Sequence, residues 1–234
     1  ASLLFSIFVW EPHSIVGKNS DSHQFEQQNL WQILGSRRVL VPVFVMLMVG
    51  LTFGTTVAFL PLYIQENSIS LNAGLFYTVR GITSFIIRIL TGRASDKFGR
   101  GVFISSGLGF CLLGMLTLWT ANSSNMILLA AIFGGASGGL ILPMMVTLMT
   151  DRCPPEQRGK FFSLCIGGFD FGIAIAGPTF GFIAELIGYR SMFAVDASLA
   201  CIAIATFITL SDKDLPHSIR FAFGQGQDTY AVNQ

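Results

Sequence analysis

The sequence has little charge. Asp, Glu, Lys and Arg make up only 12% of the 234 residues, and the formal net charge is +1, whereas a soluble domain carries about 25% charged residues. Hydrophobic residues make up 52%, with 22 Phe. A water-soluble fold of this length cannot bury so much apolar surface, so the composition indicates insertion into a membrane. No basic stretch suggests nucleic-acid binding.

Several features of enzymes are also missing. The four cysteines form no C-x-x-C pair and no ligand spacing with histidine, so we interpret them as small apolar side chains. All three histidines lie outside the apolar runs, which argues against a membrane metalloenzyme. No G-x-x-x-x-G-K-[ST] phosphate-binding loop occurs. We therefore expect no enzyme activity, no metal and no cofactor.

What the sequence does have is six long apolar runs. Each exceeds the roughly 17 residues that a membrane-crossing helix needs, and none alternates as a barrel strand would. We predict an all-α membrane protein with spans at Val39–Ile64, Leu71–Gly92, Val102–Trp119, Met126–Met149, Phe161–Ile187 and Met192–Leu210.

The remaining segments give the predicted domain organisation. Residues 1–10 are apolar, but ten helical residues rise only about 15 Å, so we interpret them as the tail of a truncated transmembrane helix. Residues 11–38 are a polar linker, 39–210 form the six-helix domain, and 211–234 are a polar tail that we expect to be loose.

The basic residues predict the orientation. The linker, the loops after the second and fourth spans, and the tail together hold eleven Lys and Arg, whereas the opposite side holds only Arg190. Under the positive-inside rule, the linker, those loops and the C-terminal tail are cytoplasmic.

A short pattern occurs twice. Gly92-x-x-x-Asp96-x-x-Gly99-Arg100 follows the second span, and Gly181-x-x-x-Glu185-x-x-Gly188-Tyr189-Arg190 follows the fifth, offset by 89 residues. Three spans separate the copies, so they fall on opposite membrane faces. This placement predicts two inverted three-helix repeats.

The first copy resembles the signature loop of the major facilitator superfamily. Arg88 before it, the Pro154–Gly159 loop, Gly188-Tyr189-Arg190, and Phe59–Tyr63 at the end of the first span resemble the same family. The resemblance covers residues 39–210 and implies the C-terminal half (helices 7–12) of a bacterial-type efflux permease in an inner membrane. A missing N-terminal six-helix half would be the partner, with the small-molecule path between the halves and lipid around both.

The resemblance implies a proton-coupled antiporter that exports amphipathic compounds by alternating access. Two alternatives stay open: a permease that takes up a sugar or an organic anion, and a partial half-transporter that is inactive alone. The resemblance and the loop chemistry together nominate a conformational latch, whose contacts form in one state and break in another. Its residues are Arg88, Gly92, Asp96, Gly99 and Arg100.

Two charges inside the spans stand out. Arg80 and Asp170 each lie about 15–18 Å from the inner end of their span, near the bilayer centre, where a charge must face protein or water. We consider an Arg80–Asp170 ion pair, or a protonatable coupling site at Asp170. Asp196 lies near the outer surface in this interpretation and is expected to pair with Arg190.

Glycines and cavity candidates complete the prediction. Small residues in the fourth and fifth spans predict closely packed helices. In the family, the first and fourth helices of a half line the cavity, so the resemblance nominates aromatic, Met and Thr side chains on these spans: Phe53, Thr55, Thr56, Phe59, Met144, Met145 and Thr147.

Overall fold

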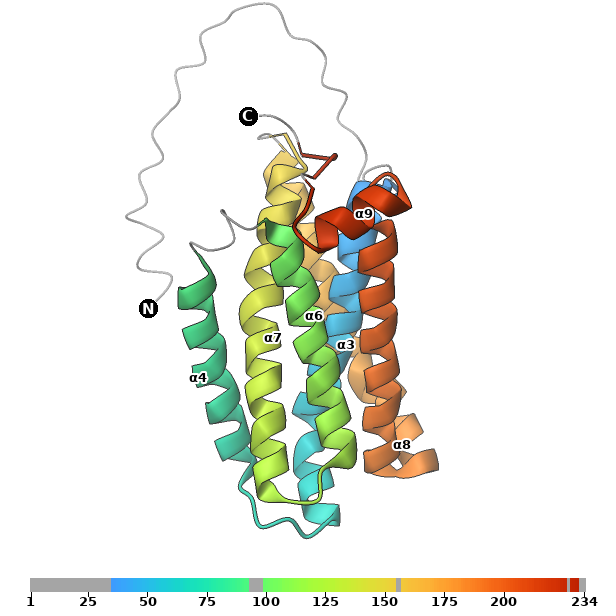
Figure 1. The fold of residues 1–234 in the computed structure, drawn as a ribbon. Coiled ribbons are helices and arrows are strands. Elements are labelled where there is room, and N and C mark those ends of the chain that lie inside the picture. Colours follow the sequence, from blue (N-terminus) through green and yellow to red (C-terminus); the bar gives the residue numbers. More distant parts are fainter. Residues whose placement is uncertain (1–34, 93–98, 155–156, 227, 232–234) are drawn as a thin grey trace, which may run out of the picture.

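The computed structural model describes residues 35–92, 99–154, 157–226 and 228–231. The regular elements of this part of the chain are all helices, and the long ones stand side by side in a bundle (Figure 1). They are α3 (Arg37–Glu66), α4 (Ala73–Gly92), α6 (Arg100–Thr120), α7 (Ser124–Asp151), α8 (Arg158–Leu210) and α9 (Leu215–Ala222).

Helix α8 contains two spans. Its 53 residues would extend about 80 Å as one straight helix, far beyond a hydrocarbon core of roughly 30 Å. Gly188 breaks it with φ 79° and ψ 158°, a conformation that suits glycine because it has no Cβ. We call residues 158–187 the first arm and 189–210 the second arm. Together with the four other long apolar helices, the two arms confirm the six predicted spans.

Two helix pairs pack backbone to backbone. Helix α3 lies against the first arm of α8, where a Cβ on Gly172 would overlap the carbonyl oxygen of Leu47. Helix α4 lies against α7, where a Cβ on Gly135 would sit 2.5 Å from the carbonyl oxygen of Arg80. The first helix of each three-helix repeat thus packs against the second helix of the other repeat: span one against span five, and span four against span two. Two inverted repeats are expected to pack in this symmetric way. The predicted glycine packing is confirmed.

We expect Gly172→Ala to lower the free energy of unfolding by about 1–3 kcal/mol, because the added methyl group must push the helices apart. Gly177→Ala on the same arm is the matched control, since a Cβ there meets nothing within 4 Å. Thermal unfolding of both variants in detergent micelles, followed by circular dichroism, measures the difference. Equal losses in the two variants would contradict the packing argument.

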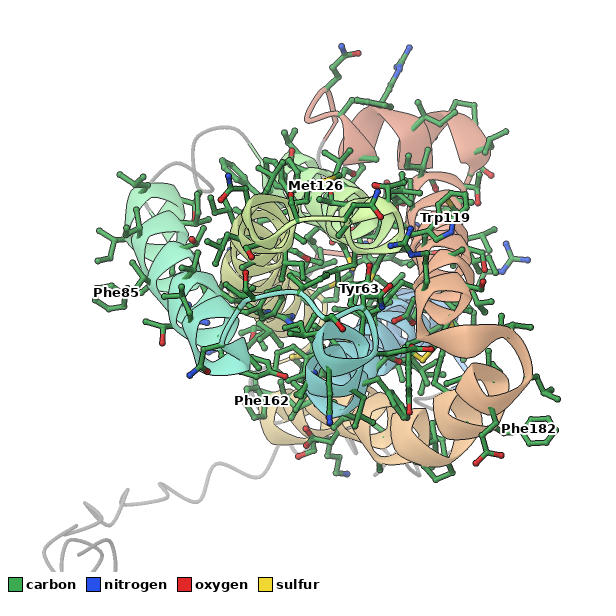
Figure 2. All side chains as sticks on the ribbon, turned by 90° about the horizontal axis from the view of Figure 1, so that it is seen from below. Tyr63, Phe85, Trp119, Met126, Phe162 and Phe182 are labelled. Carbon is green, nitrogen blue, oxygen red and sulfur yellow. The ribbon has the colours of Figure 1, made fainter. Side chains whose placement is uncertain are left out.

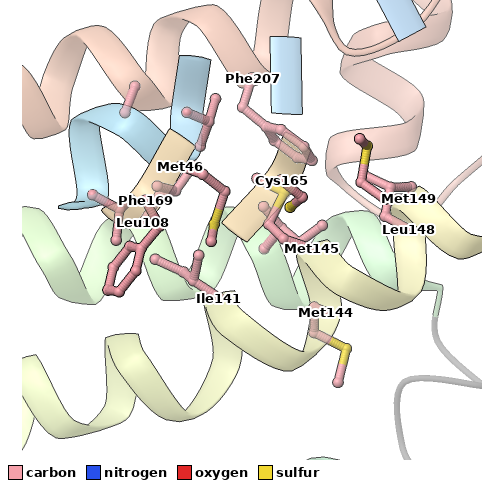
Figure 3. Packing of buried hydrophobic residues seen from close by; sticks show 14 of the residues in the cluster. Met46, Leu108, Ile141, Met144, Met145, Leu148, Met149, Cys165, Phe169 and Phe207 are labelled. Atoms are coloured by element: carbon pink, nitrogen blue, oxygen red, sulfur yellow. The ribbon is translucent and has the colours of Figure 1, made fainter. Parts of the chain in front are cut away.

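Buried side chains form two clusters, one toward each end of the bundle. One cluster gathers Met46, Met145, Cys165 and Phe207 from α3, α7 and both arms of α8 (Figure 3). The other includes Tyr63 near the centre of the view along the bundle (Figure 2). Dispersion between such interdigitated side chains, and not a hydrophobic drive, holds helices together in lipid.

The predicted loose tail is wrong for residues 211–226 and 228–231. Helix α9 packs across one end of the bundle (Figure 1). There, Arg152 is fully buried, and its Nε donates to Oδ2 of Asp228 at 2.7 Å while its Nη2 donates to Oδ1 at 3.1 Å. Arg152 also donates to the carbonyl oxygens of Ser211 and Arg38. One guanidinium therefore joins α3, α7, α8 and the tail.

We call this the basic end of the bundle. It holds the start of α3, the start of α6, the α7–α8 connection and α9 (Figure 1). The basic residues of the described loops gather here, and the opposite end carries Arg190. The basic residues that the sequence assigns to one side of the membrane therefore lie at one end of the described bundle.

Candidate functional site

A partly open cavity of about 310 Å³ lies among the helices. It is lined by residues of α3, α4, α6, α7 and the first arm of α8, and Gly81 in its wall is exposed. Its lining is mainly apolar and consists of Val49, Thr52, Phe53, Tyr77, Arg80, Gly81, Ser84, Cys111, Met115, Gly134, Ser137, Gly138, Ile141, Leu142 and Phe169. The volume lies at the small end of the range found for ligand pockets.

Arg80 is the charged residue of this lining. Its guanidinium carbon lies 4.5 Å from the centroid of the Phe53 ring, within the range of a cation–π contact. A Cβ on Gly134 would lie 3.5 Å from its Nε, so the bare backbone of α7 leaves room for the side chain. Among the described residues, Arg80 has no ion pair and no hydrogen-bond partner.

The Arg80–Asp170 ion pair does not form. Asp170 is exposed on the first arm of α8, whereas its neighbour Phe169 lines the cavity and lies 5.6 Å from the Phe53 ring. Successive helical residues point about 100° apart, so the inward turn of Phe169 directs Asp170 outward. Depth alone placed both charges at the same level, but it did not determine which way each one points.

Asp196 is the functional candidate that the sequence interpretation misplaced. It is fully buried on the second arm, and neither carboxyl oxygen has a hydrogen-bond partner in the part of the chain that the structure describes. The Thr55 hydroxyl donates instead to the carbonyl of Leu51. The expected Arg190 pair does not form, because Arg190 donates to the carbonyl of Ala121 and to Oδ1 of Asn122.

A periodic pattern could have identified Asp196 as buried. Phe193, Ala197, Ala200 and Ala203 all face the interior, which is the spacing of one helix face. Asp196 lies on that face, next to Ala197. Acidity at a span end suggested the surface, but the small residues at this spacing were the better guide.

Small polar groups lie beside Arg80 in the cavity wall. Thr52 Oγ1 lies 3.5 Å from Cys111 Sγ, and both residues line the cavity. The interior thus has a cation on α4 and a buried carboxyl on the second arm of α8.

The other nominated lining residues lie elsewhere, except Phe53. Thr56 donates to the carbonyl of Thr52 within its own helix, and Phe59 lies 6.1 Å from the ring of Tyr189. Met144 belongs to the core cluster, and Thr147 donates to the carbonyl of Pro143. Their place along a path between two halves stays a prediction.

The nominated latch residues lie at the basic end where they are described. Gly99 has φ +84° and precedes α6. Arg100 forms an ion pair with Asp151 and donates to the carbonyl of Thr147 at 2.9 Å, which joins the start of α6 to the end of α7. Gly92 ends α4, and Arg88 is exposed one turn earlier. Asp96 lies outside the described residues.

Comparison with known proteins adds the family. The family model described as Major Facilitator Superfamily matches residues 1–117 and 42–225. Multidrug resistance protein 3 of Bacillus subtilis is 30% identical over 128 residues, which cover 54% of this chain and 25% of the relative. Quinolone resistance protein NorA of Staphylococcus aureus is 23% identical over 176 residues, covering 75% of this chain and 45% of the relative. The chain thus spans less than half the length of these relatives.

Proposed function

Because the chain belongs to the Major Facilitator Superfamily, we propose that it forms one half of a transporter that exports small amphipathic compounds, driven by a proton gradient. The observation that carries this proposal is the mainly apolar cavity lined by a bundle of membrane-spanning helices. The names of the relatives, which refer to multidrug and quinolone resistance, support efflux. The multi-pass helices and the family point to a transporter rather than an enzyme.

The lining favours amphipathic compounds over sugars. Phe53, Tyr77 and Phe169 give the cavity aromatic walls, and no Asn or Gln is among the residues that line it. Aromatic and aliphatic side chains bind apolar ligand surface. A sugar site would need many more hydrogen-bonding groups, so sugar uptake has less support.

We propose a second six-helix half as the partner. Helix α4 buries only Phe76 within the described bundle, and both α4 and the first arm of α8 carry large exposed apolar side chains. Phe85 on α4 and Phe182 on α8 point outward at the periphery (Figure 2). These two helices are equivalent in the inverted repeat, and their faces offer room for a partner as well as for lipid.

We further propose that the basic end faces the cytoplasm of a bacterium. The gathering of Lys and Arg at that end supports this orientation under the positive-inside rule. The C-terminal tail would then be cytoplasmic, as would the latch residues. Rocking of the two halves would expose the substrate path to each side in turn.

The complete protein, with both halves, should accumulate a fluorescent amphipathic dye in inside-out vesicles when the interior is acidic. A protonophore should abolish the accumulation, and ATP should not restore it. Phe53→Asn should reduce the flux by about 10-fold or more, because burial of one aromatic side chain stabilises by about 1.5–3 kcal/mol. Phe223→Asn is the control, since Phe223 is an exposed residue of the tail. Accumulation that persists after the proton gradient is dissipated would overturn the proposed coupling.

A further inference from the structure

Arg80 has unsatisfied hydrogen-bonding capacity. A guanidinium has five N–H donors, and the described residues supply no acceptor for any of them. The Phe53 ring covers one face of the group, which contributes about 0.5–2 kcal/mol. That is less than the cost of a charge at membrane depth. An acceptor with negative charge would offset the rest.

The chain itself does not supply that acceptor within the described residues. Asp170 is exposed on the outside of the first arm. Asp196 forms no ion pair and no hydrogen bond with Arg80 among the described residues. Facing Arg80 from α3, α6 and α7 are neutral groups, namely Thr52, Cys111 and Ser137.

The shape of the cavity indicates what would accompany the negative charge. Phe53, Phe169 and Ile141 line it, and a volume of about 310 Å³ is large enough for a fused aromatic ring system, whose faces the two Phe rings could cover. The planar fork of an arginine matches the two oxygens of a carboxylate. Arg80 is therefore placed to bind a carboxylate at one end of a ligand, and the apolar walls are placed to bind its ring.

We propose that this cavity is a binding site for small aromatic carboxylates, in which Arg80 holds the carboxylate and the apolar walls hold the ring. The biological role of the site rests on the proposed transport function, since it would make amphipathic anions a substrate class. Binding itself requires no transport and can be measured on this chain alone.

The test is calorimetric titration of the chain in a neutral detergent with three probes of one shape: 2-naphthoate, 2-naphthalenemethanol and 2-naphthylmethylammonium. We expect naphthoate to bind at least 10-fold more tightly than the alcohol and the ammonium probe to bind worst. Arg80→Gln should weaken naphthoate binding by about 10–100-fold, because a hydrogen bond to a charged group contributes about 1.5–3 kcal/mol. Binding of the alcohol should change little.

Arg220→Gln is the control, because Arg220 is an exposed arginine of α9 that does not line the cavity; it should keep the naphthoate preference. Circular dichroism checks that each variant is folded. If Arg80→Gln does not fold, the order of the affinities of the three probes for the unaltered chain still tests whether the cavity prefers a carboxylate. Equal affinities for all three, or a preference for the ammonium probe, would overturn the proposal.

The outcome separates this inference from the proposed function. Naphthoate binding without dye export by the complete protein would refute the transport proposal and leave the site intact. Dye export together with equal binding of the three probes would refute the site and leave the transport proposal intact. If this chain bound naphthoate but the complete protein did not, the proposed site would be overturned. In that case a carboxylate of the second half would pair with Arg80 in place of the ligand.

Discussion

Arg152→Gln should lower the free energy of unfolding by about 3–5 kcal/mol and release the C-terminal tail. Arg152 is fully buried, and Asp228, its bidentate partner, is 9% exposed in the side chain. Removing one partner of a buried ion pair leaves the other charge without compensation, which costs far more than the intact pair contributes. The glutamine would also leave the carbonyls of Ser211 and Arg38 with weaker donors or none.

Two measurements check this expectation. Unfolding in micelles gives the loss of stability, and limited trypsin digestion at Lys213 and Arg220 reports whether the tail has detached. Arg158→Gln is the control, since Arg158 is an exposed arginine at the start of α8 and should behave like the unaltered chain. The double variant Arg152→Met with Asp228→Leu should lose less stability than Arg152→Gln, because no charge is then left buried alone. Equal losses for Arg152→Gln and Arg158→Gln would show that the buried pair does not hold the tail.

The spans could be predicted because the bilayer simplifies the problem. A helix must be long enough and apolar enough to cross, and both properties are visible in a single sequence. The predicted first span, Val39–Ile64, lies within α3 (Arg37–Glu66). The break at Gly188 was also predictable. An apolar segment long enough for two spans cannot form one straight helix within a single bilayer, so it must turn back.

The rotation of each helix could not be predicted with the same success. Hydropathy in a membrane helix marks lipid-facing and protein-facing positions alike, so the inward face carries a weak signal. Asp170 and Asp196 show the consequence, since the residue expected inside is exposed and the one expected outside is buried. The cavity was likewise beyond the sequence, because it is assembled from α3, α4, α6, α7 and α8.

The tail was mispredicted for a related reason. Its polar composition resembles that of a loose terminus, and the contact that orders it joins Arg152 to Asp228 across 76 residues of chain. Composition does not reveal a pairing of that kind. The family, in contrast, could be recognised from short loops such as 92–100 and 154–159, because the two-glycine reversal and the basic residues are local features.

Asp196→Asn should reduce proton-driven export by the complete protein at least 10-fold and remove most of its dependence on pH. Asp196 is a buried carboxyl group with no ion pair and no hydrogen bond among the described residues, so no fixed partner there would compete with a proton for it. Ionisation would require water or a cation to reach it. A rearrangement that admits water to Asp196 would let the proton leave. Asparagine has nearly the same shape, but it cannot bind or release a proton in this way.

Asp170→Asn is the informative comparison, because the sequence nominated Asp170 for the same role and the structure places it on an exposed face. We expect it to leave the pH dependence of export closer to that of the unaltered protein. Infrared difference spectra provide a second readout on this chain alone: the C=O stretch of a protonated carboxylic acid should change with pH in the unaltered chain, and this change should be absent from Asp196→Asn. Asp196→Leu should fold at least as stably, since it removes an unsatisfied buried polar group, and should still fail to couple export to protons. If Asp170→Asn abolishes the pH dependence and Asp196→Asn does not, the proton is carried on the outer face of the first arm, and Asp196 serves only to pack the second arm against α3 and α6.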